Sequence, residues 1–217
     1  MASLAEKYRP KTLQEVVGQE KAVKVLSRLD PGGRAFYITG KSGTGKTTLA
    51  KIIAGNVTTE QCTREVVARH LKPSDLQDWY YRAIQGGSIL GEGWALIVNE
   101  SHGLTKPVIE LMLDVLENLK PWMVVVFTTT NDGKAVFDEQ MDAEPFLSRC
   151  HEIRLEMRNI ARPIAERVKW IAEREGLDGK PIEEYMKLAT ARYHDKPSCH
   201  CNMRKMLDRV EEGEMLD

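Results

Sequence analysis

The residues with the clearest chemistry lie between Gly40 and Thr47 and read Gly-Lys-Ser-Gly-Thr-Gly-Lys-Thr. This run fits G-x-x-x-x-G-K-[ST], the P-loop pattern, in which backbone N–H groups surround a polyphosphate. An apolar stretch at 35–38 precedes the run and a helix-forming stretch at 47–54 follows it, so an ordinary Gly-rich turn is the weaker interpretation. Lys46 would reach the β- and γ-phosphates, and the Thr47 hydroxyl would take a Mg²⁺ position. The sequence therefore predicts a nucleoside triphosphate site.

A second polar group follows the apolar run at 94–98, which ends in Asn99-Glu100-Ser101-His102. In P-loop ATPases, acidic residues after such a strand serve Mg²⁺ and the attacking water. Glu100 is placed to polarise that water, although a solvated strand-end acid is the plain alternative. Asn99 is neutral and a weaker partner for a hard cation than an aspartate would be. Either hydrolysis is slowed, or the metal depends more on Thr47 and the phosphates.

The elements that must position these residues change character along the chain. Apolar stretches at 35–38, 65–68, 94–98 and 123–127, and a last strand-like stretch at 151–155, alternate with helical patterns, which predicts a parallel sheet. One of these helices begins near Pro73, and Gly86-Gly87 is its expected end. From residue 158 onward only helical patterns occur, at 160–175, 181–193 and 202–212. We therefore expect an α/β domain over 1–156, with a parallel five-stranded sheet flanked by helices, and a helical lid domain over 157–217.

The composition is that of a globular protein, with 42% hydrophobic and 29% charged residues and a net charge of −1. This charge gives no global signal for nucleic acid, so any DNA contact must come from a local patch. No apolar stretch is long enough to cross a membrane, and the first residues lack a signal core, which predicts a cytoplasmic protein. Cys199-His200-Cys201 lacks the usual zinc spacing, which favours free thiols over a metal site.

Four further segments carry a family resemblance. They are Leu-Ala-Glu-Lys-Tyr-Arg-Pro at 4–10, Val-Val-Gly-Gln at 16–19, Ser-Arg-Cys at 148–150 and Asn-Met-Arg-Lys at 202–205. In this order, around the P-loop, they resemble the AAA+ ATPases of the clamp-loader type, which include the small subunits of replication factor C and the clamp-loader subunits of DNA polymerase III. Such subunits usually carry a third, collar domain, and the present sequence ends just after the expected lid. Either the chain is truncated or it assembles differently.

The resemblance implies roles for individual residues. It implies an adenine pocket formed by Tyr8, Arg9, Pro10, Val17 and Gly18. It implies a phosphate-binding cradle formed by Ser42, Gly43, Thr44, Gly45, Lys46, Thr47 and Thr48. Sensor 1 would be Asn131, with Thr130 as the alternative, and Met203 and Arg204 would begin the sensor-2 helix, with Arg204 reaching the γ-phosphate. Arg149 would be an arginine finger acting on ATP in a neighbouring subunit, because a guanidinium stays charged and offers a planar fork to phosphate oxygens. The implied catalytic residues are thus Lys46, Glu100, Asn131, Arg149 and Arg204, and the implied metal contacts are Thr47 and Asn99.

The expected function is that of an ATP- and Mg²⁺-dependent ATPase subunit in a homo- or hetero-oligomer, coupled to assembly on a sliding clamp or primer–template DNA. Basic residues near the second strand are candidate DNA contacts, and a solvated charged surface explains them equally well: Arg64, Arg69, His70, Lys72 and Arg82. Two rivals remain open. One is an ATP-binding interaction subunit with little or no hydrolysis, for which Asn99 is the evidence. The other is a different AAA+ machine, such as a branch-migration motor or a remodeller.

Overall fold

The computed structural model describes residues 3–90, 93–130, 144–156, 160–190 and 202–216. The chain divides into two compact units. The sheet unit comprises Val25–Gly40 and Gly45–Leu155. The lid unit comprises Met1–Lys24, Lys41–Thr44 and Glu156–Asp217. Helix α2 (Glu20–Leu26) contains the first boundary between them. No helix in the described ranges has the length and apolar character needed to span a membrane.

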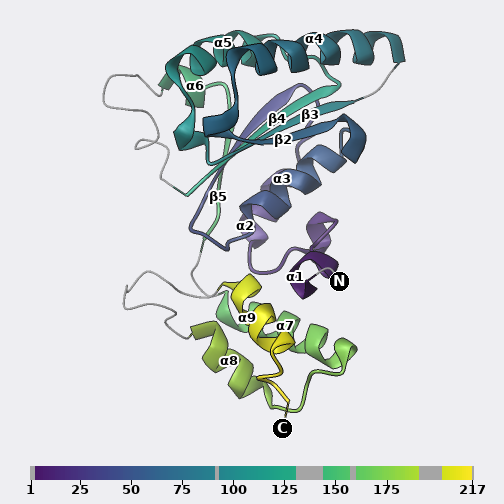
Figure 1. Ribbon diagram of the computed structural model, residues 1–217, viewed down its shortest axis with the longest axis vertical. Helices are drawn as coiled ribbons and strands as arrows, with labels where there is room; N and C mark the ends of the chain where they lie inside the picture. Colours follow the sequence, from purple (N-terminus) through teal and green to yellow (C-terminus); the bar gives the residue numbers. More distant parts are fainter. Residues whose placement is uncertain (1–2, 91–92, 131–143, 157–159, 191–201, 217) are drawn as a thin grey trace. The chain divides into compact units, whose positions relative to one another are not determined.

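The sheet unit alternates strands with helices (Figure 1). Its strands are β1 (Arg34–Thr39), β2 (Thr63–Val67), β3 (Trp94–Asn99), β4 (Met123–Thr129) and β5 (His151–Arg154). Its helices are α3 (Lys46–Gly55), α4 (Pro73–Leu90), α5 (Lys106–Glu117) and α6 (Glu144–Leu147), with 3₁₀ turns η2 (Glu60–Cys62), η3 (Ala68–His70) and η4 (Ser101–Gly103). The strands pair in the order β2-β3-β4-β1-β5, and every pair is parallel. The predicted parallel five-stranded sheet is therefore confirmed.

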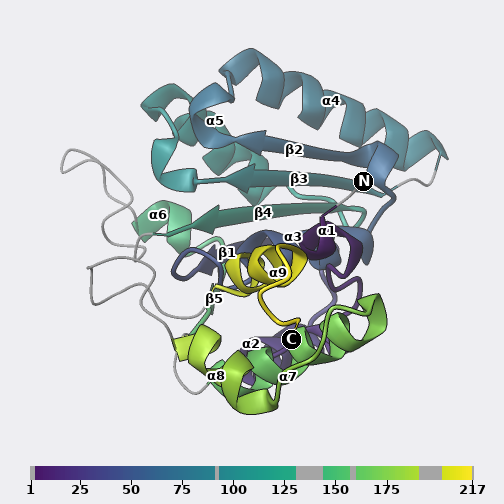
Figure 2. The same cartoon turned by 60° about the horizontal axis from the view of Figure 1, so that its bottom comes forward.

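Both faces of this sheet are covered. Successive strand side chains point to opposite faces. Tyr37, Leu96 and Phe127 pack in one cluster with residues of α4 and α5, which lie beside one another on one side of the strands (Figure 2). Phe36 and Ile97 alternate with them along β1 and β3 and are also fully buried, and α3 contacts β1, β3 and β4. Coverage of both faces explains why the central strands β1, β3 and β4 are largely continuous apolar runs in the sequence.

The predicted helix end at Gly86-Gly87 is wrong, because α4 continues through both glycines to Leu90. An added Cβ on Gly86 would lie 2.7 Å from Trp94 Nε1, and one on Gly87 would lie 1.8 Å from Trp122 Nε1. The two glycines therefore make room for indole rings. A glycine pair in a helical pattern is ambiguous between these two roles until the packing partner is known.

This packing gives a stability prediction. Gly87→Ala is expected to lower the free energy of unfolding by about 1–3 kcal/mol, the usual cost of overpacking. The indole cannot move away freely, because Trp122 Nε1 donates a hydrogen bond to the Ala83 carbonyl at 2.9 Å. Urea unfolding measures the change. Gly55→Ala is the matched control, since no atom lies within 4 Å of its added Cβ and alanine favours a helix. Equal stability of the two variants would contradict the packing argument.

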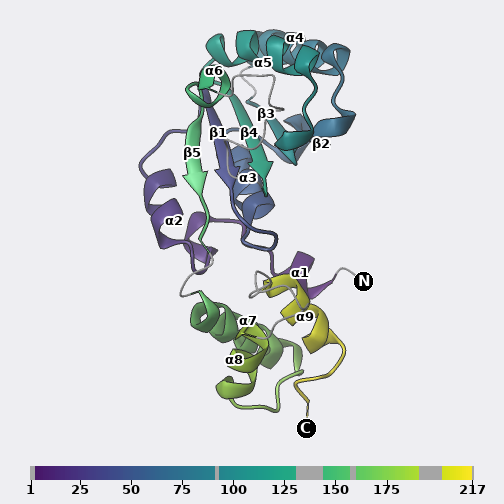
Figure 3. The ribbon, with the colours of Figure 1, turned by 90° about the vertical axis from the view of Figure 1, so that its left-hand side faces the viewer.

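The lid unit contains the short helix α1 (Leu4–Lys7), the 3₁₀ turn η1 (Leu13–Glu15), and the helices α7 (Ala161–Glu175), α8 (Ile182–Thr190) and α9 (Met203–Glu211) (Figure 3). Its core joins residues from all four helices, among them Leu4, Val168, Tyr185 and Met206. Because Leu4 and Tyr8 pack into this core, the amino-terminal segment groups with the carboxy-terminal helices and not with the sheet. The predicted division of the chain between residues 156 and 157 stays a prediction.

Candidate functional site

The carboxyl ends of β1, β3 and β4 form the edge of the sheet at which the predicted phosphate and metal residues begin. Thr39 at the end of β1 pairs with Thr129 on β4, and Asn99 at the end of β3 pairs with Thr128. Gly40 continues this arrangement, since its N–H donates to the Thr129 carbonyl at 3.3 Å. Ligands of parallel α/β sheets bind at this edge, outside the carboxyl ends of the strands.

The P-loop leaves β1 and enters α3 through glycines with left-handed backbone angles. Gly43 and Gly45 have φ values of 82° and 96°, a region that side chains with a Cβ seldom adopt. Gly45 is the N-cap of α3, no side chain caps the helix there, and no atom lies within 4 Å of an added Cβ on Gly45. The first N–H groups of a helix have no partner inside it. The amino end of α3 therefore has open space and donors suited to an anion.

Lys46, the first residue of α3, places a buried ammonium at this end of the helix. The residue is 8% exposed, and its Nζ donates to the Gly40 carbonyl at 2.8 Å. Burial lowers the pKa of the Lys46 ammonium below its ordinary value of 10.5, and the Glu100 carboxylate partly offsets that effect. A buried ammonium at an uncapped helix end is a site that a bound phosphate would stabilise. The residues of the sheet unit thus fit the triphosphate that the sequence predicted.

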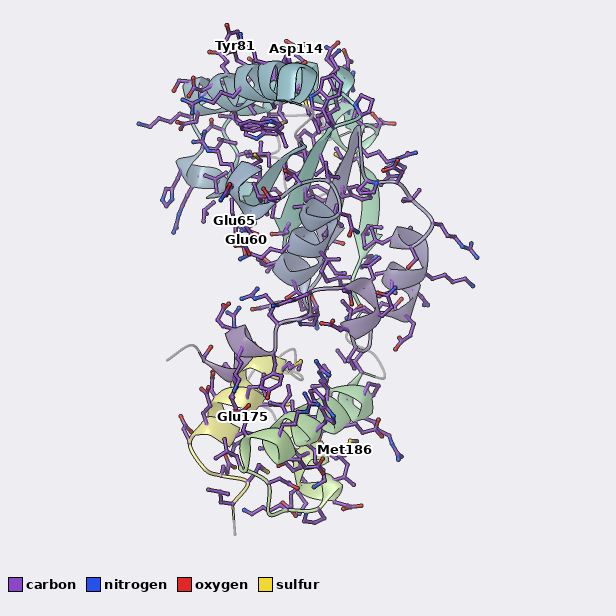
Figure 4. All side chains as sticks on the ribbon, turned by 90° about the vertical axis from the view of Figure 1, so that its right-hand side faces the viewer. Glu60, Glu65, Tyr81, Asp114, Glu175 and Met186 are labelled. Atoms are coloured by element: carbon purple, nitrogen blue, oxygen red, sulfur yellow. The ribbon has the colours of Figure 1, made fainter. Side chains whose placement is uncertain are left out.

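Asn99 is held by a chain of polar contacts across three strands. Its Nδ2 donates to Glu65 Oε1 on β2 at 2.7 Å, and its Oδ1 accepts from the Thr128 hydroxyl on β4 at 2.8 Å. Glu65 Oε2 lies 3.2 Å from Lys51 Nζ on α3. Figure 4 labels Glu65 on β2. The sequence drew attention to Asn99 but gave no sign of Glu65, which lies 34 positions away and becomes a neighbour only when β2 pairs with β3.

Glu100 has an unusual backbone. Its φ of 54° and ψ of 51° lie in the left-handed region. Among the described residues, no other non-glycine residue has a positive φ. Such strain at a non-glycine residue costs energy and often accompanies a functional position. The Glu100 Oε2 lies 3.5 Å from His102 Nδ1, which in turn lies 3.2 Å from Thr129 Oγ1. His102 is thus a neighbour of Glu100 to which sequence reasoning assigned no role.

The protein donors for a magnesium ion are few. Among the residues that the structure describes, no three His, Cys, Asp or Glu side chains gather as a metal site. Mg²⁺ commonly takes one or two protein ligands and completes its shell with phosphate oxygens and water. The Thr47 hydroxyl and Asn99 Oδ1, which retains a second lone pair, fit this sparse pattern.

Within the lid unit, the tip of the P-loop meets the start of α9. An added Cβ on Gly43 would lie 2.6 Å from Asn202 Cγ, so this approach requires glycine. Asn202 caps α9, because its Oδ1 accepts from the Arg204 N–H at 3.1 Å. Met203 and Arg204 form the first turn of α9, and Arg204 is exposed.

Gln19, the last residue of the Val-Val-Gly-Gln segment, makes contacts that the sequence did not indicate. Its buried side chain donates from Nε2 to the Glu156 carbonyl at 2.9 Å and accepts at Oε1 from the Glu156 N–H at 3.1 Å. The same Nε2 lies 3.5 Å from the Thr44 carbonyl at the loop tip. Next to it, an added Cβ on Gly18 would lie 3.0 Å from Ile160 Cβ. A buried glutamine amide was detectable in the sequence only as part of the Val-Gly-Gln element.

The residues predicted to surround adenine all lie in the lid unit, namely Tyr8, Arg9, Pro10, Val17 and Gly18. The Tyr8 hydroxyl donates to the Glu175 carboxylate, which also lies 2.7 Å from Lys7 Nζ, and the Tyr8 ring meets Trp170 edge-on at 6.0 Å. Hydrogen bonds from Lys7 and Tyr8 lower the pKa of Glu175. Within the described residues, Arg9 Nε is buried without a hydrogen-bond partner.

Arg149 follows α6 and comes just before the amino end of β5. Because β5 is parallel to β1, this is the sheet edge opposite to Gly40. The guanidinium contacts the Glu117 carboxylate and the Pro145 carbonyl of its own chain. The sheet unit therefore does not bring Arg149 to the phosphate-binding end of its own P-loop.

Other predicted residues lie elsewhere or outside the described residues. Asn131 and the Cys199-His200-Cys201 segment are among the residues that the structure does not describe, while Thr130 is exposed directly after β4. Two of the candidate DNA contacts are ion-paired: Arg64 with Asp75 at 3.3 Å, and Arg82 with Asp78 at 3.1 Å. These pairs neutralise part of the basic patch, and DNA binding there stays a prediction.

Comparison with known proteins found no matching protein-family model. The replication factor C large subunit of Sulfolobus acidocaldarius is 31% identical over 139 residues, which are 58% of this chain and 31% of that protein. The replication factor C small subunit of Methanosphaera stadtmanae is 27% identical, over 81% of this chain and 54% of that protein. DNA polymerase III subunit gamma of Buchnera aphidicola is 23% identical, over 97% of this chain and 61% of that protein. The chain thus spans between about a third and three fifths of the length of these relatives.

Solved structures of RuvB from Thermotoga maritima share the fold. One, described as a Holliday junction branch migration motor, has a TM-score of 0.63 at 23% identity over 97% of this chain and 76% of that one. A mutant of the same protein has a TM-score of 0.70 at 22% identity, over 95% of this chain and 66% of the mutant chain. At this identity the likeness concerns the fold alone. The curated relatives, by contrast, confirm the resemblance that the motifs predicted: this chain is similar to AAA+ ATPases of the clamp-loader type.

Proposed function

We propose that the chain is an AAA+ ATPase subunit that binds ATP with Mg²⁺ and hydrolyses the γ-phosphate. The observation that carries the proposal is the buried Lys46 at the uncapped amino end of α3, with the Glu100 carboxylate as its opposite charge. Phosphate oxygens would replace the missing cap and compensate the buried ammonium, as anions do at helix amino ends.

Each residue has a task in this mechanism. The first N–H groups of α3 and the Lys46 ammonium would hold the β- and γ-phosphates and stabilise the charge that develops during transfer. Glu100 would accept a hydrogen bond from the attacking water and align it. A bound Mg²⁺ would supply neutralisation of the phosphate charge. The Thr47 hydroxyl and Asn99 Oδ1 would hold that ion from the protein side.

At a finer level, we propose a clamp-loader-type subunit, active in an oligomer, that couples its nucleotide state to assembly on a sliding clamp or primer–template DNA. The support is the similarity to replication factor C and DNA polymerase III subunits, together with the Ser-Arg-Cys and sensor-2 segments. Arg149, at the edge opposite to its own P-loop, is a suitable group for the nucleotide of a neighbouring subunit. Arg204 would contact the γ-phosphate.

The test measures binding of a fluorescent ATP analogue and release of phosphate, with and without Mg²⁺. We expect nucleotide binding, and turnover that primer–template DNA plus a sliding clamp stimulates more than junction DNA does. Greater stimulation by junction DNA would point to a branch-migration motor, whose fold the RuvB structures share. A protein that neither binds the analogue nor releases phosphate would refute the proposal.

A second candidate is an ATP-binding interaction subunit with little or no hydrolysis. The amide of Asn99, at a position where a carboxylate is expected, favours it. The same measurements decide between the two. Mg²⁺-dependent binding with no phosphate release above that of a Lys46→Met variant would favour the interaction subunit, whereas measurable Lys46-dependent release would favour the ATPase.

A further inference from the structure

Asn99 has neighbours that require an amide. Toward Glu65 it must donate, because an ionised carboxylate only accepts hydrogen bonds, and toward the Thr128 hydroxyl it accepts. An asparagine provides both functions from one side chain. An aspartate at this position would bring a second carboxylate to within hydrogen-bonding distance of Glu65, and the two like charges would repel. The residue that looked like a weakened aspartate is therefore matched to its surroundings.

The charge that Asn99 lacks is present on the neighbouring strand. Glu65 accepts the Asn99 amide N–H at 2.7 Å, and Lys51 anchors the other carboxylate oxygen from α3 at 3.2 Å. A carboxylate that accepts an amide N–H polarises the amide and makes its oxygen a better acceptor. The contact also fixes which end of the amide faces Glu65, so that Oδ1 faces Thr128 at the phosphate-binding edge of the sheet.

We propose that Glu65 is a positioning residue that supplies, from β2, the negative charge missing at Asn99, and that the Glu65–Asn99 pair is the acidic element of the metal side of the site. The part that concerns the metal rests on the proposed function, because it requires a nucleotide-bound Mg²⁺. The part that concerns the pair does not, since the contact is present in the protein alone.

Four proteins test the pair by moving one carboxylate between the two strands. The wild type has it on β2. The double variant Glu65→Gln/Asn99→Asp has it on β3, where the glutamine amide can donate to the new carboxylate. Glu65→Gln alone has none, and its side-chain oxygen can still accept from Asn99. Asn99→Asp alone has two, facing each other.

The first measurement is urea unfolding without nucleotide or metal. Asn99→Asp is expected to raise the unfolding equilibrium constant about fivefold, the size of a like-charge contact near 4 Å in a solvated setting. Adding Glu65→Gln should remove this loss. If Asn99→Asp proved as stable as the double variant, the two side chains would not interact and the proposal would be overturned, whatever the protein does with nucleotide.

The second measurement is the Mg²⁺ concentration that gives half-maximal binding of a fluorescent ATP analogue. Glu65→Gln is expected to raise it roughly tenfold, as the loss of a residue that orients a metal ligand does. The double variant should stay close to the wild type. An unchanged Mg²⁺ requirement in Glu65→Gln would refute the role at the metal.

The matched control is Glu60→Gln, which removes an exposed carboxylate from the turn just before β2 (Figure 4). It is expected to leave both measurements unchanged. An equal rise in the Mg²⁺ requirement for this variant would show a general surface-charge effect and overturn the assignment to Glu65. If the wild type bound no nucleotide, the role at the metal would fall with the proposed function, while the unfolding measurement would still decide on the pair.

Discussion

Lys46→Met is expected to lower nucleotide turnover by about 10²–10³-fold, the effect of removing one preorganised group that stabilises transition-state charge. Methionine fills a similar volume without the ammonium, so the buried end of the loop keeps its packing. Phosphate release at saturating ATP measures the loss. Lys24→Met is the control, because Lys24 is an exposed lysine on α2 outside the loop. Turnover that survived in Lys46→Met would separate the P-loop from the activity.

The same substitution has a pH-dependent consequence for the protein alone. Burial lowers the pKa of Lys46 in the folded state below the unfolded value of 10.5. At pH values between these two pKa values, the unfolded chain therefore binds more protons than the folded protein does. The buried charge therefore destabilises the wild type at neutral pH, and the penalty decreases as the pH rises toward 10.5. Without nucleotide and metal, the stability of the wild type relative to Lys46→Met is expected to increase from pH 7 to pH 10, as thermal unfolding would show. A difference that stayed constant would mean that Lys46 keeps its ordinary pKa.

The sheet could be predicted from the sequence because its signals are local. Each strand covered on both faces is a continuous apolar run, and the P-loop motif identifies the strand end and helix start that flank it. The failure at Gly86-Gly87 had a tertiary cause: the reason for these glycines is two tryptophans that come from β3 and from the turn before β4. Local propensity does not carry that information.

In the candidate site, too, local features could be predicted from the sequence and tertiary contacts could not. Residues inside one motif, such as Lys46 and Glu100, could be named from their spacing. Contacts that depend on strand pairing could not. Glu65 becomes a neighbour of Asn99 only through the β2–β3 register, and Gln19 reaches Glu156 across more than a hundred positions. The sequence therefore could not show that the Asn99 amide lies next to a carboxylate, and its role at the metal stays a prediction.

Arg149→Ala is expected to reduce turnover roughly 10³–10⁵-fold if Arg149 acts as an arginine finger. Binding of a fluorescent ATP analogue should change little, because the guanidinium would act on the neighbouring subunit's transition state. Arg162→Ala is the control, since it removes an exposed arginine that is paired with Glu166. A loss of turnover of the same size in that variant would show an effect of surface charge and not of a finger.

The action between subunits has its own test. Arg149→Ala keeps an intact P-loop but lacks the finger, and Lys46→Met keeps the finger but lacks the P-loop lysine. Each variant alone should therefore be inactive. In an oligomer of identical subunits, mixing the two places wild-type Arg149 beside wild-type Lys46 at a fraction of the interfaces. Phosphate release should therefore return in the mixture, and it should rise with protein concentration as oligomers form. A mixture as inactive as its components, in a protein shown by mass measurement to form mixed oligomers, would mean that Arg149 does not act in trans. Its role would then be the contact with Glu117 that holds the end of α5 to the start of β5.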